Sequence, residues 1–275
     1  MPAPRIAFAT ALASTALLAG NVVSAASVTE ASDPGTATVD RVIGDGRINE
    51  SSGLVASRRH AGVLYTHNDS GDRPRIFATA RSGSTRAVLK LPHAQARDWE
   101  DISAGPNQTL WIGDIGDNRR RRDRIQVYRI SEPATLTSKR VKSTRYELAY
   151  RDGAHDAEAL LVRPNSGRLY VVSKQASGAA IYAAPRTLRA HRVNRLTKVR
   201  SAPPTVTAGD LAPGGEMVLR NYSRMYVYPS MRGQSQTIDL PEQPQGESAA
   251  FAAGGETVVV GSERLNSTVW RVTLP

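Results

Sequence analysis

Acidic residues recur in this sequence where apolar runs end, in a pattern that could bind a metal ion. The segment THNDSGD (66–72) follows one apolar run, and a related segment, GDIGDN (113–118), follows another. Both contain Asp-x-Gly-Asp, starting at Asp69 and at Asp114, 45 residues apart. Glycine favours tight turns because it adopts positive φ, whereas aspartate is also an oxygen ligand for metals. The motif therefore fits turn chemistry, a shared site, or both.

Glutamates open the segments that precede these apolar runs. The four segments are ESSGLVAS from Glu50, EDISAG from Glu100, EALLVRP from Glu158 and ESAAFAAGG from Glu247. A fifth segment, GDLAPGG, begins with Gly209 where the others have glutamate. The opening positions 50, 100, 158, 209 and 247 are 50, 58, 51 and 38 residues apart. These intervals lie near the length of a propeller blade, roughly 40 to 50 residues.

The elements that position these residues read as short strands. Each unit contains an opening strand, a turn, an apolar strand, a polar break and a strand with an aromatic residue, and almost no segment has a sustained helical period. We predict an all-β fold, a five-bladed β-propeller. The segment ATVDRVIG (37–44) would complete the last blade and remove its exposed edge. A β-sandwich is the alternative, because it too is built from evenly spaced short strands.

The ends of the second strands align in one register. A small polar residue ends each strand and a variable residue follows it. The first series is Asn68, Asp114, Ser173, Asn221 and Ser262, and the second is Asp69, Ile115, Lys174, Tyr222 and Glu263. Because consecutive strands of a blade are antiparallel, these ends share a face with the opening glutamates. We expect them to converge at the mouth of the central channel, together with Asp98 and Asp156.

Carboxylates gathered at one mouth repel one another unless cations offset them or their pKa values rise. Oxygen ligands of this kind favour Ca²⁺ over Mg²⁺, whereas Zn²⁺ is not expected because cysteine is absent and the five histidines lack ligand spacing. The predicted metal ligands are Glu50, Glu100, Glu158 and Glu247. The predicted ligand-binding residues are Asn68, Asp69, Asp114, Lys174, Arg220, Asn221 and Glu263. The candidate catalytic residues are His67, Asp98, His155, Asp156, Lys174 and Arg220.

Alternative readings of these residues remain open. Any single acid could instead hydrogen-bond the backbone of a neighbouring blade. The basic run RRRRDR (119–124) is interpreted as solvated loop surface, because no aromatic residues interleave with it, so no specific nucleic-acid partner is expected. No Gly-x-Ser-x-Gly motif marks a serine hydrolase.

Composition bounds the class of protein. The chain has 275 residues, 40% hydrophobic content, no cysteine and a formal net charge of +11. Residues 1–25 are interpreted as a secretory signal peptide, 26–37 as a flexible lead-in and 38–275 as a single propeller domain. We therefore expect a secreted, extracellular monomer without a membrane span, stabilised by burial rather than by disulfides.

The motifs resemble those of secreted bacterial β-propellers of largely unassigned role. These motifs are Glu50-Ser-Ser-Gly, Asn68-Asp69-x-Gly71-Asp72, Trp99-Glu100-Asp101 and Gly113-Asp114-Ile-Gly-Asp117-Asn118. More distantly, the chain is similar to calcium-dependent apyrases and propeller phytases. The apyrase resemblance implies five blades around a Ca²⁺ ion with blade-start glutamates, which would fall on Glu50, Glu100, Glu158 and Glu247. Gly209 departs from that set.

Three functional hypotheses follow. The first is a secreted propeller that binds an anionic small molecule or cell-envelope polymer at the acidic mouth, with Ca²⁺. The second is a metal-dependent phosphoester hydrolase that uses the same residues. The third is a structural or interaction scaffold without site chemistry. The sequence leaves open whether the protein is an enzyme.

Overall fold

The computed structural model describes Met1 and residues 37–274 of the chain. The predicted signal peptide, apart from Met1, and the predicted lead-in, apart from Ala37, lie outside the described residues. All regular secondary structure within 37–274 is β, and these residues belong to one compact unit. The described part of the chain contains no helix that could span a membrane.

The strands form four sheets. One sheet has the order β2-β3-β4-β5-β9, with β2 Ser51–Ala56, β3 Leu64–Asn68, β4 Arg75–Thr79, β5 Thr85–Lys90 and β9 Lys139–Arg140. A second has the order β15-β16-β17-β18, with β15 Ala208–Leu211, β16 Met217–Arg220, β17 Arg224–Tyr228 and β18 Gln236–Asp239. A third has the order β1-β21-β20-β19, with β1 Ala37–Val42, β19 Gly246–Phe251, β20 Thr257–Ser262 and β21 Thr268–Thr273.

The largest sheet has eight strands in the order β11-β12-β13-β14-β10-β8-β7-β6. Its strands are β6 Trp99–Gly105, β7 Thr109–Asp114, β8 Ile125–Ser131, β10 Thr144–Tyr150, β11 Ala157–Val162, β12 Leu169–Ser173, β13 Ala180–Ala183 and β14 Val193–Ser201. β10 and β14 pair in parallel, whereas every other pair in this sheet is antiparallel. The sheet therefore consists of two antiparallel four-stranded runs joined at their outer edges.

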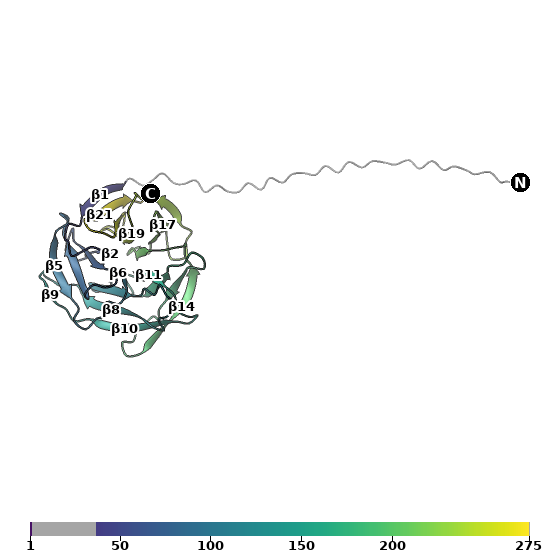
Figure 1. Ribbon diagram of the computed structural model, residues 1–275, viewed down its shortest axis with the longest axis horizontal. Helices are drawn as coiled ribbons and strands as arrows, with labels where there is room; N and C mark the ends of the chain where they lie inside the picture. Colours follow the sequence, from purple (N-terminus) through teal and green to yellow (C-terminus); the bar gives the residue numbers. More distant parts are fainter. Residues whose placement is uncertain (2–36, 275) are drawn as a thin grey trace. The chain divides into compact units, whose positions relative to one another are not determined.

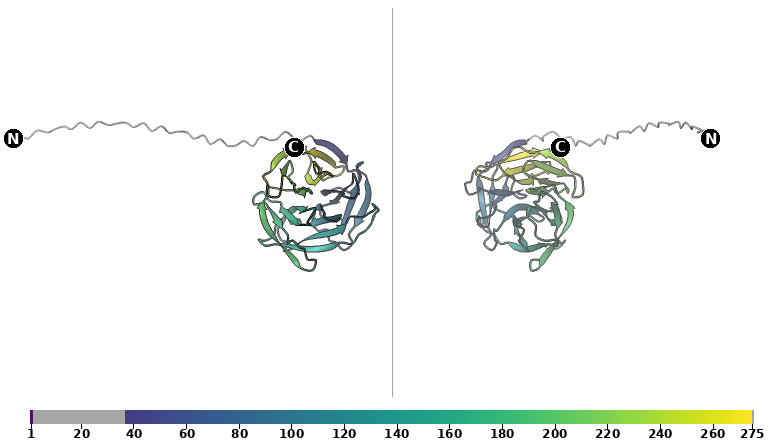
Figure 2. Two further views of the ribbon diagram at one scale, coloured as in Figure 1. Left: turned by 180° about the vertical axis from the view of Figure 1, so that it is seen from behind. Right: turned by 45° about the vertical axis from the view of Figure 1, so that its right-hand side comes forward.

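The first strands of these runs surround the centre of the molecule. β2, β6, β11, β15 and β19 contact one another in chain order, and β19 contacts β2. Figure 1 shows these inner strands around the centre, with β5, β9, β10 and β14 at the perimeter. The other views show the same ring (Figure 2). The sheets thus form a ring rather than two stacked layers, which favours the propeller-type prediction over the β-sandwich.

The two ends of the described chain meet in one sheet. β1 pairs with β21 in antiparallel fashion, from Ala37 opposite Val272 to Val42 opposite Thr268. The Asp40 carboxylate accepts hydrogen bonds from Arg41 Nε at 2.7 Å and from Arg271 Nε at 3.0 Å. The predicted pairing of residues 37–44 with the end of the chain is therefore present, and it covers an edge that β21 would otherwise expose.

The core lies between neighbouring sheets. β3, β6 and β11 are buried along their whole length, which explains why their sequences read as apolar runs with small residues. Trp99, for example, packs with Leu89 and Tyr128 from two adjacent sheets, and its indole N–H donates to the Gln95 carbonyl at 2.7 Å. Such contacts fix the inner strands, which carry the acidic residues described next.

Candidate functional site

Three of the four opening glutamates occupy β-bulges at the start of inner strands. In β6 the pairing shifts between Trp99 and Asp101, in β11 between Ala157 and Ala159, and in β19 between Gly246 and Ser248. The residue left unpaired is Glu100, Glu158 or Glu247, respectively. A bulge bends its strand and redirects the side chain of the extra residue. These three glutamates therefore occupy equivalent positions, as their sequence context predicted.

Glu50 does not belong to this set. The bulge in β2 lies between Ser51 and Leu54, and Glu50 precedes the strand and is exposed. The Asp69 N–H donates to the Glu50 carbonyl at 3.0 Å, just as the Ile115 N–H donates to the Asp98 carbonyl at 3.1 Å. The structural counterpart of Glu50 is therefore Asp98, and its predicted equivalence with Glu100 is wrong.

The fourth unit departs from the others in register. β15 has no bulge, and Ala208 pairs with Arg220. Arg220, not Asn221, thus ends the second strand, and Asn221, not Tyr222, is the residue that follows it. The Asn221 side-chain oxygen accepts N–H hydrogen bonds from Ser223 and Arg224, so this residue caps a turn. The predicted alignment was one residue out here because it placed a charged residue inside the strand's apolar run.

An acidic cluster, defined as Asp69, Asp98 and Glu100, lies at this mouth. One carboxylate oxygen from each residue lies within 4.8 Å of the others. Asp69 follows β3, Asp98 precedes β6, and Glu100 is the bulged residue of β6. Glu100 is only 4% exposed. Among the described residues, no hydrogen bond or ion pair reaches the side-chain oxygens of Asp98 or Glu100.

Burial and repulsion from other acids raise the pKa values of all three acids in the cluster. Burial, and then the negative charges of Glu158, Asp69 and Asp98, raise the pKa of Glu100 well above its usual value. Burial raises the pKa of Asp69 to about 6, with Asp98, Glu50 and Glu247 contributing in the same direction. The pKa of Asp98 is also raised, chiefly by burial. A bound cation would relieve these costs, so the cluster could hold a metal.

Gly116 lies directly against the cluster. A Cβ atom at this position would lie 2.0 Å from Glu100 Oε1 and 2.5 Å from Asp98 Oδ2. The glycine of the GDIGDN segment therefore leaves the space that the two carboxylates occupy. Sequence reasoning treated this glycine only as turn chemistry, because a repeated Asp-x-Gly-Asp shows nothing of what a side chain at the glycine would meet.

A lysine pairs with one of the bulged glutamates at the mouth. Lys174 Nζ lies 2.8 Å from Glu158 Oε1 and 5.2 Å from the centre of the Tyr222 ring. Burial raises the pKa of Glu158 to about 8 even though Lys174 opposes that shift. Glu263 is half-buried, and burial followed by Glu247 and Asp69 raises its pKa to about 7. The mouth thus combines several acids with the partly exposed ammonium group of Lys174.

Other predicted site residues form hydrogen bonds or ion pairs that stabilise the fold. The Asn68 side-chain amide donates to the Arg47 carbonyl at 2.8 Å and to Asp72 Oδ2 at 2.9 Å. Asp114 is buried in an ion pair with Arg122 at 2.8 Å. Arg122 is itself 7% exposed, so the prediction that RRRRDR is solvated throughout is wrong at this position.

Arg220 is fully buried beneath the mouth. Its guanidinium donates to Gln243 Oε1 at 2.8 Å and to the carbonyls of Asn221 at 2.8 Å and Tyr222 at 3.0 Å. Burial lowers its pKa to about 10, which leaves it positively charged at neutral pH. It therefore contributes charge beside Glu247 rather than a surface that a ligand could contact.

The two predicted histidines differ in environment. His67 is fully buried and packs edge-on against Trp99, and burial lowers its pKa to about 4. His155 is half-buried and contacts the Tyr182 hydroxyl at 2.9 Å and Asp152 Oδ1 at 3.2 Å. Asp156 is buried and accepts the Asp117 N–H at 2.8 Å. His67 is therefore neutral at physiological pH.

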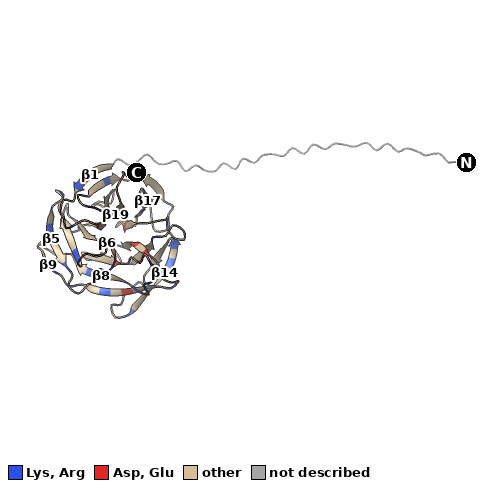
Figure 3. Ribbon diagram, viewed as in Figure 1, with Lys and Arg blue, Asp and Glu red and all other residues tan. Residues whose placement is uncertain are grey.

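Charge is distributed unevenly over the molecule. Figure 3 shows Lys and Arg mainly on the outer strands, whereas acidic residues appear near the centre close to β6. The overall formal charge of +11 thus conceals a central acidic site. This arrangement explains why net charge alone is a poor guide to the ligand of this mouth.

Comparison with known proteins places the fold. No protein-family model matches the chain, and no curated protein matches it in sequence. Among solved structures, a gluconolactonase from Xanthomonas campestris superposes with a TM-score of 0.51 at 13% identity, covering 88% of this chain and 96% of that one. This likeness supports a propeller-type fold. It gives no support to the resemblance to apyrases and phytases.

Proposed function

We propose that this protein binds a divalent cation at Asp69, Asp98 and Glu100 and uses it to hold an anionic ligand at the mouth of the ring. The single observation that carries this proposal is the buried, unpartnered carboxylate of Glu100 within 4.8 Å of two further acids. Carboxylates brought together without protein cations require protons or a metal. Oxygen-only ligands with no histidine among them suit Ca²⁺ or Mg²⁺, and flexible geometry favours Ca²⁺.

Lys174 is the residue that would bind the anionic ligand directly. Its ammonium group pairs with Glu158 and lies over Tyr222, and it is about one-fifth exposed. A bound cation on one side and Lys174 on the other would together attract an anion that bridges them. Glu158 and Glu247, predicted as metal ligands, would then tune this lysine rather than coordinate the metal, and Glu50 would lie at the rim.

Four broader expectations belong to the same proposal. The two four-stranded runs of the large sheet and the three smaller sheets would make five blades, with β9 added to the edge of one and β1 completing another. The chain would be exported by residues 1–25, and it would act as a monomer. The anionic ligand would be a small molecule or a cell-envelope polymer.

Hydrolysis is the second candidate function, favoured by the fold shared with a gluconolactonase. A bound divalent cation polarises an ester, lactone or phosphoryl oxygen. Glu263, with a pKa of about 7, could accept a proton near neutral pH. The substrate would be a lactone or, as the sequence resemblance implies, a phosphoester.

Calorimetric titration of the purified protein, residues 37–275, with CaCl₂ and with MgCl₂ tests the cation site. We expect Ca²⁺ to bind and to raise Tm, because a ligand selective for the folded state stabilises it. Glu100→Gln and Asp98→Asn should each weaken Ca²⁺ binding at least tenfold. Glu242→Gln, at an exposed position, is the matched control. Unchanged Ca²⁺ affinity in both cluster variants would refute the site.

Catalysis is tested separately with the same variants. Gluconolactone, nucleotides and phytate are incubated with wild-type protein in the presence and absence of Ca²⁺, and acid or phosphate release is measured. Turnover that requires Ca²⁺ and is lost in Glu100→Gln supports the hydrolase. Ca²⁺ binding without turnover of any substrate in the panel supports the binding function instead.

A further inference from the structure

A second pocket lies on the face opposite the acidic mouth. It is formed by the β11–β12 turn, the β15–β16 turn and the β17–β18 turn, which lie at the other ends of the strands that lead to the mouth. Its volume is about 890 Å³, large enough for a small organic molecule. Four arginines line it: Arg163, Arg168, Arg200 and Arg232. We call it the arginine pocket.

The positive charges of the arginine pocket are not paired with acidic residues. None of its lining residues is acidic, and among the described residues none of the four arginines forms an ion pair with a carboxylate. Glu216 is close by, against Gly214, but it does not pair with these arginines. Like charges gathered in one concavity raise the local concentration of anions. This pocket therefore differs in sign from the mouth.

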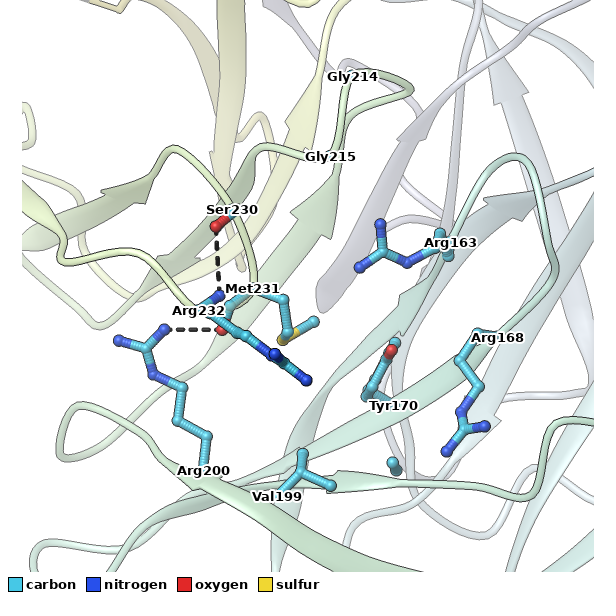
Figure 4. Close-up of a pocket in the computed structure, with 11 residues that line it drawn as sticks. Arg163, Arg168, Tyr170, Val199, Arg200, Gly214, Gly215, Ser230, Met231 and Arg232 are labelled. Atoms are coloured by element: carbon cyan, nitrogen blue, oxygen red, sulfur yellow. Dashed lines mark hydrogen bonds between the residues drawn. The ribbon is translucent and has the colours of Figure 1, made fainter.

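One of the four arginines has a structural role. Arg200 Nη1 donates to the Met231 carbonyl at 2.8 Å, and its guanidinium lies 4.7 Å from the centre of the Tyr228 ring. Figure 4 shows this bond at the edge of the pocket. Arg200 thus holds the turn that presents Arg232, and it is not free to meet a ligand with its whole guanidinium.

The other three arginines have unused donors. Arg168 lies 6.0 Å from the centre of the Tyr170 ring, and its Nε is buried without a hydrogen-bond partner. The two Nη groups of Arg168 form no hydrogen bond or ion pair with other described residues, so they are free to bind an anion. In Figure 4, Arg232 extends toward Tyr170 from the adjoining sheet, and Arg163 and Arg168 flank Tyr170 on the other side of the pocket. Guanidinium groups bind phosphate and carboxylate in bidentate fashion.

We propose that the arginine pocket binds an organic anion that carries at least two phosphate or carboxylate groups. Arg163, Arg168 and Arg232 would bind these groups, with the carbon skeleton against Tyr170 and Val199. Two charged groups are required because the arginines come from both walls of the pocket. This site is separate from the cation site, since it lies on the opposite face and needs no metal.

Calorimetric titration of metal-free protein, prepared on a chelating resin, tests the proposal. The probes are inorganic pyrophosphate, citrate and inorganic phosphate. We expect pyrophosphate or citrate to bind at least tenfold more tightly than phosphate, and the preferred probe identifies the group as phosphate or carboxylate. The variants are Arg163→Gln/Arg232→Gln and, separately, Arg168→Gln, each checked for an unchanged circular dichroism spectrum.

The expected result is at least a tenfold loss of affinity in both arginine variants. Arg86→Gln, an exposed arginine on another sheet, and Lys174→Gln at the mouth should keep wild-type affinity. Binding lost in Lys174→Gln but kept in the arginine variants would overturn the proposal, because the anion would then occupy the mouth. Failure of all three probes to bind wild-type protein would overturn it as well.

Discussion

Glu100 is an acidic side chain whose ionised form is strongly disfavoured at the mouth. Its bulged position turns a strand residue toward other acids, and the carboxylate is 4% exposed with no protein cation bonded to it. A buried charge in that state is unstable unless it is neutralised. Neutralisation of this carboxylate, by a proton or by the proposed cation, should therefore stabilise the fold.

The raised pKa values predict a specific dependence of stability on pH. Asp69, Glu263 and Glu158 have pKa values of about 6, 7 and 8, all above their usual values. Groups with raised pKa values bind protons more tightly when folded, so their contribution to stability is lost as pH rises through those values. His67 has the opposite effect, because its pKa is lowered to about 4. Its contribution to stability is lost as the pH falls below its usual pKa of about 6.5.

Metal-free protein should therefore lose thermal stability between pH 6.5 and 8, and saturating Ca²⁺ should reverse most of the loss. Differential scanning calorimetry at half-unit pH intervals measures this effect. The double variant Glu158→Gln/Glu263→Gln should have a flatter profile than wild type, because two of the titrating groups are gone. A wild-type Tm that is constant or rising over this range would contradict the assignment of these pKa values.

Gly116→Ala should disturb the cluster without replacing any of its acidic residues. The added Cβ would meet the ends of the Glu100 and Asp98 side chains at 2.0 and 2.5 Å, which must then move. We expect Ca²⁺ affinity, measured by calorimetric titration, to fall at least tenfold, while the protein remains folded because flexible side-chain ends can yield. Gly44→Ala, where a Cβ would meet nothing within 4 Å, is the control and should bind normally.

At the scale of the element, the inner strands show what the sequence could and could not predict. Repeated glutamates predicted equivalent positions for Glu100, Glu158 and Glu247, and the bulges confirm that equivalence. Glu50 was misplaced because a bulge adds a residue without altering the apolar pattern, so the register of a strand start cannot be counted from sequence. The cluster itself required a residue that precedes β6, Asp98, and one that follows β3, Asp69.

The misassignment in β16 has a different cause, because the alignment counted Arg220 within the apolar run and so placed the end of the strand one residue too late. Charged residues are rarely buried. Arg220 is nevertheless buried, because carbonyl and amide oxygens from three neighbouring segments surround its guanidinium. A Cβ at Gly246 would lie 1.8 Å from its Nη2, so β19 begins with glycine where this side chain passes.

Arg220→Ala should be strongly destabilising. The substitution removes several hydrogen bonds to a charged group, leaves Gln243 and backbone carbonyls without donors, and removes a cation near Glu247. We expect a loss of about 3 kcal/mol or more in the free energy of unfolding, measured by urea denaturation. Arg224→Ala, which removes an exposed ion pair with Asp239, should change stability by about 0.5 kcal/mol or less.

At the scale of the whole molecule, the ring places an acidic cluster and an arginine-lined pocket on opposite faces. The acidic cluster lies where first strands begin and second strands end. The arginine pocket is formed by turns at the other ends of such strands. The sequence predicted the first site because acids recur with the strand period. It gave no signal for the second, since Arg163 and Arg232 are 69 residues apart and only the packing of adjacent sheets brings them together.

Closure of the ring depends on the pairing of β1 with β21, and its removal is the sharpest test of the architecture. A chain that begins at residue 44 lacks β1, so β21 becomes an exposed edge and the buried pair of Asp40 with Arg41 is lost. A chain that begins at residue 37 keeps β1 and serves as the control. We expect the shorter chain to lose about 3 kcal/mol or more, a decrease in Tm of about 6–12 °C, and to aggregate. A synthetic peptide of residues 37–44 should restore part of the lost stability by pairing with β21, whereas equal melting of the two chains would show that β1 does not close the ring.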